Sequence, residues 1–235
     1  MSSLPNNAKA VIALTSWKER ISTVGQTLFN LLVQCPGFHI VLTLSSEEFP
    51  NQLNELPKDL QKLYQLGLIE IIWCKKNVRS FKKILFAMHK YPEVPIISAD
   101  DDCLYKYNYA EELYSIWKYN QNMRCCYWCA HLIDDIYNTS GYATLHPPYY
   151  YGDSYLLLND RIIDLHEDDL FYAAICSLQK RKGCICLHKS FNEVAVVHDE
   201  SKPLHNTYRN TVSCIERYKT MLSAIKRSLY EYNRK

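Results

Sequence analysis

The sequence predicts an α/β fold in which helices cover both faces of a mostly parallel sheet. Over the first hundred residues, short apolar runs rich in β-branched residues alternate with segments whose apolar residues recur at helical spacing. Such alternation is typical of parallel strands joined by crossover helices. The 235 residues, 48% of them hydrophobic, are enough to bury a large core. Sheets of this kind bind ligands at the carboxyl ends of their strands.

Four strands and three helices are expected in this first part of the chain. The strands are expected at residues 9–14, 39–44, 68–73 and 94–99, and the helices at residues 21–33, 59–66 and 80–89. Gly67 is expected to end the second helix, because glycine commonly follows the last helical turn.

The second half of the chain is less regular. Residues 134–151, which contain glycine, two prolines and several tyrosines, are expected to be irregular. From residue 206 onward, one amphipathic helix is expected, with Val212, Ile215, Leu222, Ile225 and Leu229 on its apolar stripe. The other elements expected are helices at residues 109–119 and 168–179 and strands at residues 124–133, 154–158, 184–187 and 193–197.

The composition excludes several classes of protein. The six glycines form neither G-x-G-x-x-G nor G-x-x-x-x-G-K-[ST], so a nucleotide would have to bind without a glycine-rich phosphate loop. The net charge of +2 provides no field that favours nucleic acid. The N-terminus lacks the features of a signal peptide and no apolar stretch approaches the length of a membrane span, so a cytoplasmic location is expected.

The ten cysteines are expected to be reduced in that compartment. Cys126-x-x-Cys129 and Cys184-x-Cys186-x-His188 have spacings that occur in zinc sites. The same residues lie in apolar segments typical of strands, where free cysteine packs as a small hydrophobic residue. Burial in strands is the favoured interpretation, and zinc binding is the alternative.

The strongest chemical signal is Asp100-Asp101-Asp102, directly after an expected strand. Adjacent carboxylates repel one another unless a cation lies near them, and oxygen ligands at a strand end suit Mg²⁺ or Mn²⁺. In an extended segment, Asp100 and Asp102 point to one side and Asp101 to the other. A solvated acidic loop is the alternative. A calcium loop is excluded, because Leu104 and Tyr105 stand where a ligand and a glycine are required.

Two further groups are candidates for chemistry. Glu167-Asp168-Asp169 begins an expected helix about 65 residues further along the chain, where carboxylates either cap the helix or act as a general base. His198 follows the last expected strand and is a candidate third metal ligand. A structural histidine is the alternative interpretation.

Hydroxyl and basic side chains form a third set of candidates. Thr15, Ser16 and Arg20 follow the first strand, where they would hold a base, ribose or phosphate or else cap the next helix. Lys82 and Lys83 lie at the start of a helix, where cations oppose the helix dipole. A bound anion would compensate them, and a solvated helix face is the alternative.

In this order, the motifs resemble those of GT-A nucleotide-sugar glycosyltransferases, in particular the small bacterial enzymes of surface-polysaccharide (capsule and lipopolysaccharide) synthesis. The resemblance spans roughly residues 9–200. It implies a GT-A domain at residues 1–205, with a nucleotide-sugar-binding half (1–103) and an acceptor-binding half (104–205), followed by a basic helix at 206–235. The stretches that carry it are Leu14-Thr15-Ser16-Trp17 with Arg20, Ser80-Phe81-Lys82-Lys83, Ser98-Ala99-Asp100-Asp101-Asp102 with Tyr105, and Asp168-Asp169-Leu170-Phe171.

The resemblance also implies a role for each motif. The donor would be a nucleotide-diphosphate sugar, a UDP-sugar by preference, and the acceptor a glycan or a lipid-linked glycan. The catalytic base of an inverting enzyme would be Asp168 or Asp169, with Glu167 beside them. The donor-binding residues would be Thr15, Ser16, Arg20, Lys82, Lys83, Asp100 and Asp101, and the ligands of Mn²⁺ or Mg²⁺ would be Asp100, Asp102 and His198.

The acceptor side departs from the family pattern. Such enzymes often carry a glycine-rich turn before the second acidic motif, whereas Tyr151-Gly152-Asp153-Ser154 has a single glycine. The candidate acceptor contacts are Tyr149, Tyr150, Tyr151, Gly152 and Asp153, because tyrosine rings offer apolar faces to sugars. A tyrosine-rich core is the alternative.

The C-terminal segment is basic. Residues 208–235 carry seven Lys or Arg and two Glu. A basic amphipathic helix is able to lie on an anionic membrane surface, which would suit a lipid-linked acceptor. Packing against the domain or a second subunit is the alternative.

Two other functions compete with glycosyl transfer. A metal-dependent nucleotidyltransferase or phosphatase on phosphorylated sugars would use the same acidic clusters, although Leu104 replaces the threonine of Asp-x-Asp-x-Thr phosphatases. A non-catalytic sugar-binding homologue would keep the fold without the chemistry. Transfer or hydrolysis of a nucleotide sugar, as opposed to simple phosphate release, separates these functions.

Overall fold

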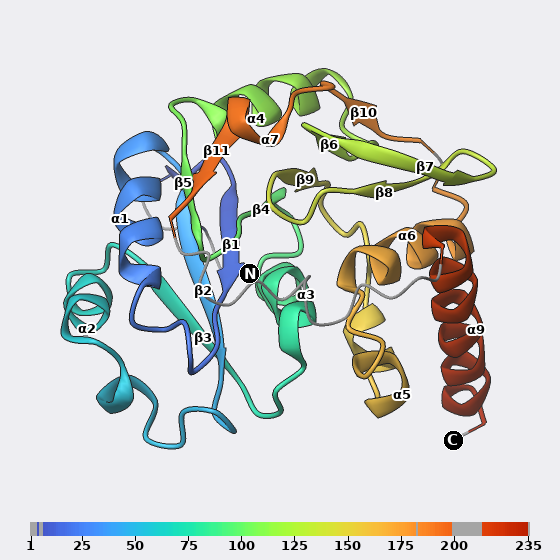
Figure 1. The fold of residues 1–235 in the computed structure, drawn as a ribbon, viewed down its shortest axis with the longest axis horizontal. Helices are drawn as coiled ribbons and strands as arrows, with labels where there is room; N and C mark the ends of the chain where they lie inside the picture. The colour runs from blue at the N-terminus through green and yellow to red at the C-terminus, as the bar shows by residue number, and fades with distance from the viewer. Residues whose placement is uncertain (1–3, 5–6, 182, 199–212, 235) are drawn as a thin grey trace.

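A seven-stranded sheet in the order β10-β6-β9-β4-β1-β2-β3 forms the centre of the molecule (Figure 1). The computed structural model describes residues 4, 7–181, 183–198 and 213–234. All neighbouring strands of the sheet are parallel except β9, which runs antiparallel between β4 and β6. The strands are β1 (Val11–Thr15), β2 (His39–Ser45), β3 (Glu70–Cys74), β4 (Ile96–Ser98), β6 (Cys125–Cys126), β9 (Thr144–His146) and β10 (Ile185–Cys186).

Helices cover both faces of this sheet, as the sequence predicts. In Figure 1, α1 and α2 lie to one side of β1–β3, and α3, α6 and α9 lie to the other. The helices are α1 (Val24–Gln34), α2 (Lys58–Gln65), α3 (Lys82–Lys90), α4 (Tyr109–Tyr119), α5 (Asp160–Ile163), α6 (Asp168–Leu178), α7 (Phe191–Val194) and α9 (Cys214–Tyr232), with short 3₁₀ helices η2 (Gln52–Glu55), η3 (Arg79–Phe81) and η4 (Ser154–Leu157).

Strand β1 shows how the sheet divides the interior into two cores. Ile12 and Leu14 pack with α1 and α4, whereas Val11 and Ala13 pack with α3, α6 and α9. Successive side chains of a strand point to opposite faces, so an unbroken apolar run serves both layers. The α/β class, the mostly parallel sheet and the C-terminal helix predicted from the sequence are therefore confirmed.

Two small antiparallel sheets stand outside the large one. Strand β5 (Cys103–Tyr105) follows the acidic triplet and pairs with β11 (Ala195–Val197). Strand β7 (Cys129–Ile133) pairs with β8 (Ile136–Thr139) in a hairpin. The β5–β11 pair brings residues 195–198 beside the segment that follows β4, and so positions His198.

Three expectations for the second half are wrong. The strand expected at 124–133 is broken into β6 and β7, and the irregular segment 134–151 contains β8 and β9. The hairpin turn is Asp134-Asp135, whose φ angles are 47° and 59°. Such turns need positive φ at both positions and usually carry Asn-Gly or Asp-Gly, so this pair gives a weak sequence signal. The strand expected at 154–158 is the 3₁₀ helix η4.

The C-terminal helix α9 packs against α6 through Tyr218, Met221 and Ile225. A capping box of Ser213 and Glu216 begins it. Ile215, expected on the apolar stripe, is 41% exposed, so the stripe is rotated from the predicted one. Val212 and the predicted domain boundary at residue 205 lie outside the described residues. No described helix has the length and apolar character needed to cross a membrane.

Candidate active site

The acidic triplet lies where β4 ends and the chain leaves the large sheet. Strands β1 and β4 are parallel neighbours, with Ala13 opposite Ser98, so the segments that follow them share one edge of the sheet. Asp101 turns inward and is 6% exposed. Its carboxylate accepts hydrogen bonds from Ser16 Oγ at 2.6 Å and from Arg20 Nη1 at 2.7 Å.

Asp101 therefore anchors the triplet. Burial raises the pKa of its carboxyl, against the opposing effect of Arg20 and Ser16. Thr15 is also committed, because its hydroxyl donates to the Thr43 carbonyl at 2.7 Å. In the structure, the side chains of Thr15, Ser16 and Arg20 thus form hydrogen bonds with other groups of the protein. Their predicted contact with a donor, like that of Asp101, stays a prediction.

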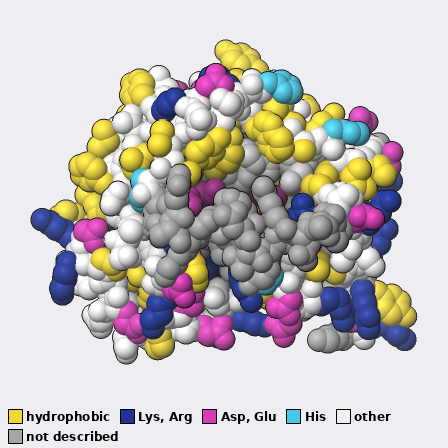
Figure 2. All heavy atoms as spheres, viewed as in Figure 1, with side chains coloured by type: hydrophobic (Ala, Val, Ile, Leu, Met, Phe, Trp, Pro, Cys, Tyr) yellow, Lys and Arg dark blue, Asp and Glu magenta, His cyan; other side chains and the backbone are white. Residues whose placement is uncertain are grey.

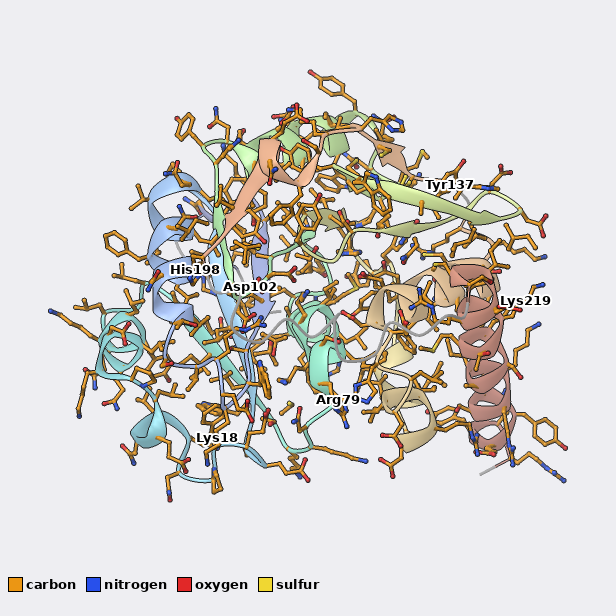
Figure 3. The ribbon with its side chains drawn as sticks, viewed as in Figure 1. Lys18, Arg79, Asp102, Tyr137, His198 and Lys219 are labelled. Atoms are coloured by element: carbon orange, nitrogen blue, oxygen red, sulfur yellow. The ribbon has the colours of Figure 1, made fainter. Side chains whose placement is uncertain are left out.

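His198 lies directly beside Asp102, as Figure 3 shows. Its backbone N–H donates to the Asp102 carbonyl at 2.8 Å, which continues the β5–β11 pairing. Its ring Nε2 is 2.9 Å from the hydroxyl of Thr27. That hydroxyl also lies within 3.0 Å of the carbonyls of Asp101 and Cys103.

Thr27 was not among the sequence candidates. It is fully buried on α1 between Val24 and Leu28, and a polar residue on the apolar face of a helix is the signal that would have identified it. Its hydroxyl contacts the acidic triplet, the start of β5 and the His198 ring, and so links α1 to all three.

The side chains of Asp100, Asp102 and Cys103 form a group whose ligand atoms all lie within 4.8 Å of one another. Carboxylate oxygens are the ligands that Mg²⁺ and Mn²⁺ prefer. Burial, reinforced by Asp100 and Asp102, raises the pKa of the Cys103 thiol, so this sulfur stays protonated and is a poor ligand for either ion. The two aspartates fit the predicted metal. The His198 ring is directed at Thr27 and lies outside this group, so its ligand role stays a prediction.

Lys83 joins the triplet to the second acidic cluster. Its Nζ atom, on a side chain only 9% exposed, forms an ion pair with Asp100 and contacts the Gly141 carbonyl at 3.4 Å. Burial alone would lower the pKa of Lys83, but the carboxylates of Asp100, Asp168 and Asp169 outweigh it and raise this pKa. Lys83 is therefore a buried cation that three carboxylates keep charged.

Lys82 points elsewhere, because successive helical residues face different directions. Its ammonium donates to Asn77 Oδ1 at 3.1 Å and to the Arg79 carbonyl at 3.2 Å, and it lies 3.5 Å from Glu48. Burial lowers its pKa, while Glu48 opposes that shift. The two lysines, paired in the sequence, thus belong to different environments, and only Lys83 contacts the acidic triplet directly.

The second cluster lies in the first turn of α6. Burial raises the pKa of the Asp169 carboxyl well above its ordinary value, and Asp168 adds to the shift, while Lys83 opposes it. Glu167, the residue before the helix, forms an ion pair with Arg217 of α9. Through this ion pair, the C-terminal helix contacts Glu167, the residue that precedes Asp168 and Asp169.

Gly141 is a second site residue that the sequence candidates missed. A Cβ atom added to it would lie 3.0 Å from Asp169 Oδ1 and 3.4 Å from Lys83 Nζ. The neighbouring Tyr142 carbonyl accepts a hydrogen bond at 2.8 Å from the Tyr105 hydroxyl, which in turn accepts one from the Asp100 backbone N–H at 2.7 Å. The segment at 141–142 thus lies against both acidic clusters.

The predicted acceptor contacts have a different environment. Tyr150 and Tyr151 are each 1% exposed and pack in the core, which is the alternative that the sequence left open. Buried in this way, they present no surface to an acceptor. Tyr149 is 54% exposed, and its hydroxyl donates to Glu93. Gly152 and Asp153 are exposed, and a Cβ at Gly152 would meet nothing within 4 Å.

The charge of the site is unbalanced. Among the residues that the structure describes, Lys82 is paired with Glu48, whereas Lys83 and Arg20 form ion pairs with aspartates of the triplet. Five described carboxyl groups lie near these two cations, namely those of Asp100, Asp101, Asp102, Asp168 and Asp169, and burial raises the pKa of Asp101 and Asp169 among them. Such an excess of negative charge favours the binding of a cation.

Comparisons with known proteins support the fold. No protein-family model and no curated protein matches this sequence. Among solved structures, TarS of S. aureus (residues 1–349) aligns with a TM-score of 0.51 and 10% identity, over 95% of this chain and 72% of TarS. This similarity shows a shared fold alone and agrees with the GT-A class predicted from the sequence.

Two other structures resemble the chain more weakly. The glycosyltransferase GlyE of Streptococcus pneumoniae TIGR4 aligns with a TM-score of 0.48 and 15% identity, over 96% of this chain and 63% of GlyE. GalNAc-T7, crystallised with UDP, GalNAc and Mn²⁺, aligns with a TM-score of 0.41 and 17% identity, over 62% of this chain. The chain spans less than two thirds of GlyE and 26% of GalNAc-T7.

Proposed function

We propose that this chain is a metal-dependent glycosyltransferase that moves a sugar from a nucleotide-diphosphate donor, a UDP-sugar by preference, to a glycan or lipid-linked acceptor in surface-polysaccharide synthesis. One observation carries the proposal. Two acidic clusters about 65 residues apart in the sequence meet at the single ammonium of Lys83. Glycosyl transfer needs both a cation site for a diphosphate and a carboxylate base, and these clusters supply candidates for each.

Asp100 and Asp102 would hold Mn²⁺ or Mg²⁺, with His198 as a further ligand. When bound, the metal offsets the negative charge that develops on a departing diphosphate. The excess of carboxylates over cations around Lys83 supports such a cation site. Asp101, held by Ser16 and Arg20, would fix the position of the two ligands beside it, and Arg20 also contacts Asp102 at 3.0 Å.

Lys83 would bind the donor through its ammonium, next to the metal ligands. Because three carboxylates raise its pKa, it stays charged at neutral pH and offers hydrogen bonds to phosphate or sugar oxygens. Thr15, Ser16, Arg20 and Lys82 would contribute to the nucleoside side of the same edge.

Asp169 would act as the general base toward the acceptor hydroxyl. Burial and the charge of Asp168 raise its pKa, and a carboxylate with a raised pKa accepts a proton more readily. Gly141 lacks a side chain, and a Cβ atom at this position would lie 3.0 Å from the Oδ1 atom of Asp169. The acceptor would approach from this side, within the proposed acceptor-binding half at residues 104–205.

A thermal-shift titration tests the proposal. UDP-, GDP-, CMP- and dTDP-sugars are added to the full chain with and without Mn²⁺, and unfolding is followed. We expect stabilisation by one class of donor only in the presence of the metal, by about 2.7 kcal/mol at 100 times the Kd. Asp102→Asn should abolish the effect, whereas Asp160→Asn, whose side chain is 79% exposed, should leave it unchanged.

The products separate the competing functions. Release of a nucleoside diphosphate together with transferred or hydrolysed sugar supports glycosyl transfer. Release of inorganic phosphate from sugar phosphates supports a phosphatase, and stabilisation that survives both a chelator and Asp102→Asn counts against the metal site. Full binding with no turnover by any donor would indicate a non-catalytic homologue.

A further inference from the structure

Four cysteines meet at the edge of the large sheet formed by β10 and β6, outside the acidic site. Cys126 ends β6, Cys129 begins β7, and Cys184 and Cys186 flank the first residue of β10. Figure 1 shows β6, β7 and β10 together in one region of the molecule. Cys126 and Cys186 are register partners in the parallel β6–β10 pair. The chain therefore brings two sequence motifs, almost 60 residues apart, to the same place.

Three of the four sulfur atoms lie at distances that suit a metal. Those of Cys126, Cys129 and Cys184 are all within 4.8 Å of one another. Four sulfurs bound tetrahedrally to zinc at about 2.3 Å stand about 3.8 Å apart. The Cys129 sulfur is also within hydrogen-bonding reach of Cys186, whose own sulfur lies 3.7 Å from His188 Nδ1. None of these cysteines forms a disulfide in the structure.

The contacts of the Cys126 and Cys186 thiols with backbone carbonyls are long. Cys126 Sγ is 3.7 Å from the Ile185 carbonyl, and Cys186 Sγ is 3.7 Å from the Tyr127 carbonyl. Cys125, the neighbour of Cys126, is fully buried in the apolar core and behaves as a small hydrophobic residue. Cys129, Cys184 and Cys186 are only partly buried, and the sulfurs of Cys129 and Cys184 lie within 4.8 Å of each other and of Cys126, which core packing does not explain.

The surroundings supply compensating positive charge. A zinc ion with four thiolates carries a net charge of −2. Arg124, two residues before Cys126, is 1% exposed, and its guanidinium donates to Thr139 Oγ1 and to the Tyr137 carbonyl. None of the ion pairs among the described residues includes Arg124, and Cys184 lies within electrostatic range of it. A buried guanidinium without a carboxylate partner suits an anionic metal centre nearby.

We propose that Cys126, Cys129, Cys184 and Cys186 bind one structural Zn²⁺ that fastens β7 and β10 to β6. Each thiol gives its proton to solvent as its sulfur binds the metal, and His188 lies outside the ligand set. Strands β6 and β10 pair over two residues each, so backbone hydrogen bonds alone hold this edge weakly. Metal binding would contribute folding free energy at this edge. The proposal does not depend on the proposed enzymatic activity.

Metal analysis of the full chain tests the site. Purified without a metal-affinity tag and under reducing conditions, the protein should contain about one zinc per chain. Cys129→Ser and Cys184→Ser should each lower the zinc content at least tenfold. Cys35→Ser, at a buried cysteine that follows α1, is the matched control and should retain the metal.

A second measurement on the unaltered chain avoids variants that fail to fold. After removal of zinc, added Co²⁺ should give the near-ultraviolet charge-transfer absorption of thiolate–cobalt bonds, and zinc should displace it. Absence of both zinc and this absorption overturns the proposal. Loss of zinc in His188→Ala with retention in Cys186→Ser overturns the assigned ligand set, whereas the reverse pattern supports it.

Discussion

Lys83, on α3, donates a hydrogen bond to the carboxylate of Asp100, which follows β4. The same ammonium lies in the field of Asp168 and Asp169 at the start of α6. One buried cation therefore connects two acidic clusters that come from different halves of the chain. A bound divalent metal or a substrate phosphate would alter the charge around Lys83. We therefore expect substitution of Lys83 to affect both the stability of the site and ligand binding.

Lys83→Met is expected to lower the free energy of unfolding by about 2 kcal/mol, because it leaves the Asp100 carboxylate without its ammonium. The value is below that of a fully buried pair, since the Asp100 side chain is 34% exposed. Urea unfolding without metal measures it. Lys9→Met, which breaks an exposed pair with Glu111, should cost less than about 1 kcal/mol. Equal losses in the two variants would contradict this account.

Gly141→Ala is expected to reduce donor turnover more than tenfold while leaving stability nearly unchanged. The added Cβ would press on Asp169 and Lys83, but the backbone of Gly141 does not have a positive φ. Gly67→Ala is the converse control, because φ is +68° and nothing lies within 4 Å. It should cost about 1 kcal/mol of stability with unchanged turnover. Turnover and thermal unfolding of both variants provide the comparison.

Thr27→Val is expected to weaken Mn²⁺ binding and to destabilise the fold by about 1–3 kcal/mol. The substitution keeps the shape of the side chain but removes the hydroxyl that the His198 ring and two buried carbonyls contact. Calorimetric titration with Mn²⁺ and urea unfolding measure the two effects. Thr220→Val, which removes an exposed hydroxyl on α9, should change neither.

Glu70 is expected to make the free energy of unfolding depend on pH. Burial raises its pKa, but hydrogen bonds from His39, Lys90 and Tyr91 outweigh burial and lower the pKa to about 2. The ionised form is therefore favoured in the folded state. Its contribution is complete above the ordinary glutamate pKa of about 4.3 and is lost as the pH falls through about 2.

Urea unfolding of the unaltered chain and of Glu70→Gln between pH 7 and pH 2 tests this expectation. The unaltered chain should be more stable at pH 7, and the difference should shrink on acidification through that window. Glu111→Gln, whose side chain is 41% exposed, should show only a small difference throughout. A difference for Glu70→Gln that is independent of pH would show that its ionisation is not the cause.

The outer face of α9 is expected to bind anionic membranes. Lys219, Lys226 and Arg227 are exposed on it, and basic side chains gather near the C-terminal end of this helix in Figure 2. Each contributes about 1 kcal/mol near an anionic surface. Co-sedimentation with anionic vesicles should be lost when all three become Gln. The fold should be retained, because the buried residues of α9 are unchanged. Equal binding to neutral vesicles would exclude the electrostatic cause.

Elements with strong local periodicity were predictable from the sequence. The alternation of strands and helices up to β4 was found because apolar runs and helical spacing are properties of neighbouring residues. Helix α4 agrees with its predicted bounds. The β7–β8 hairpin was missed, because Asp134-Asp135 adopts a turn that its residue types signal weakly. Strand β9 was missed because its three residues lie between glycine and proline.

The candidate site was predictable only in part. The acidic triplet itself was found from the sequence, but the alternation expected of an extended chain does not describe it: Asp101 and Asp102 lie in a turn, and both carboxylates accept hydrogen bonds from Arg20 Nη1. The environments of Lys82 and Lys83 differ, however, because α3 faces different neighbours at each position. Gly141 had no local signal, since its closeness to Asp169 arises from the packing of the segment before β9 against α6.

The sequence by itself determined the α/β class and the identity of the acidic clusters, because strand and helix periodicity and runs of carboxylates are local features. Only the tertiary structure decided which groups meet. It placed Asp169 near Lys83, turned the His198 ring toward Thr27, buried Tyr150 and Tyr151, and brought Cys126, Cys129 and Cys184 together. These contacts join segments distant in the chain, and strand order and helix packing, rather than local spacing, determine which segments become neighbours.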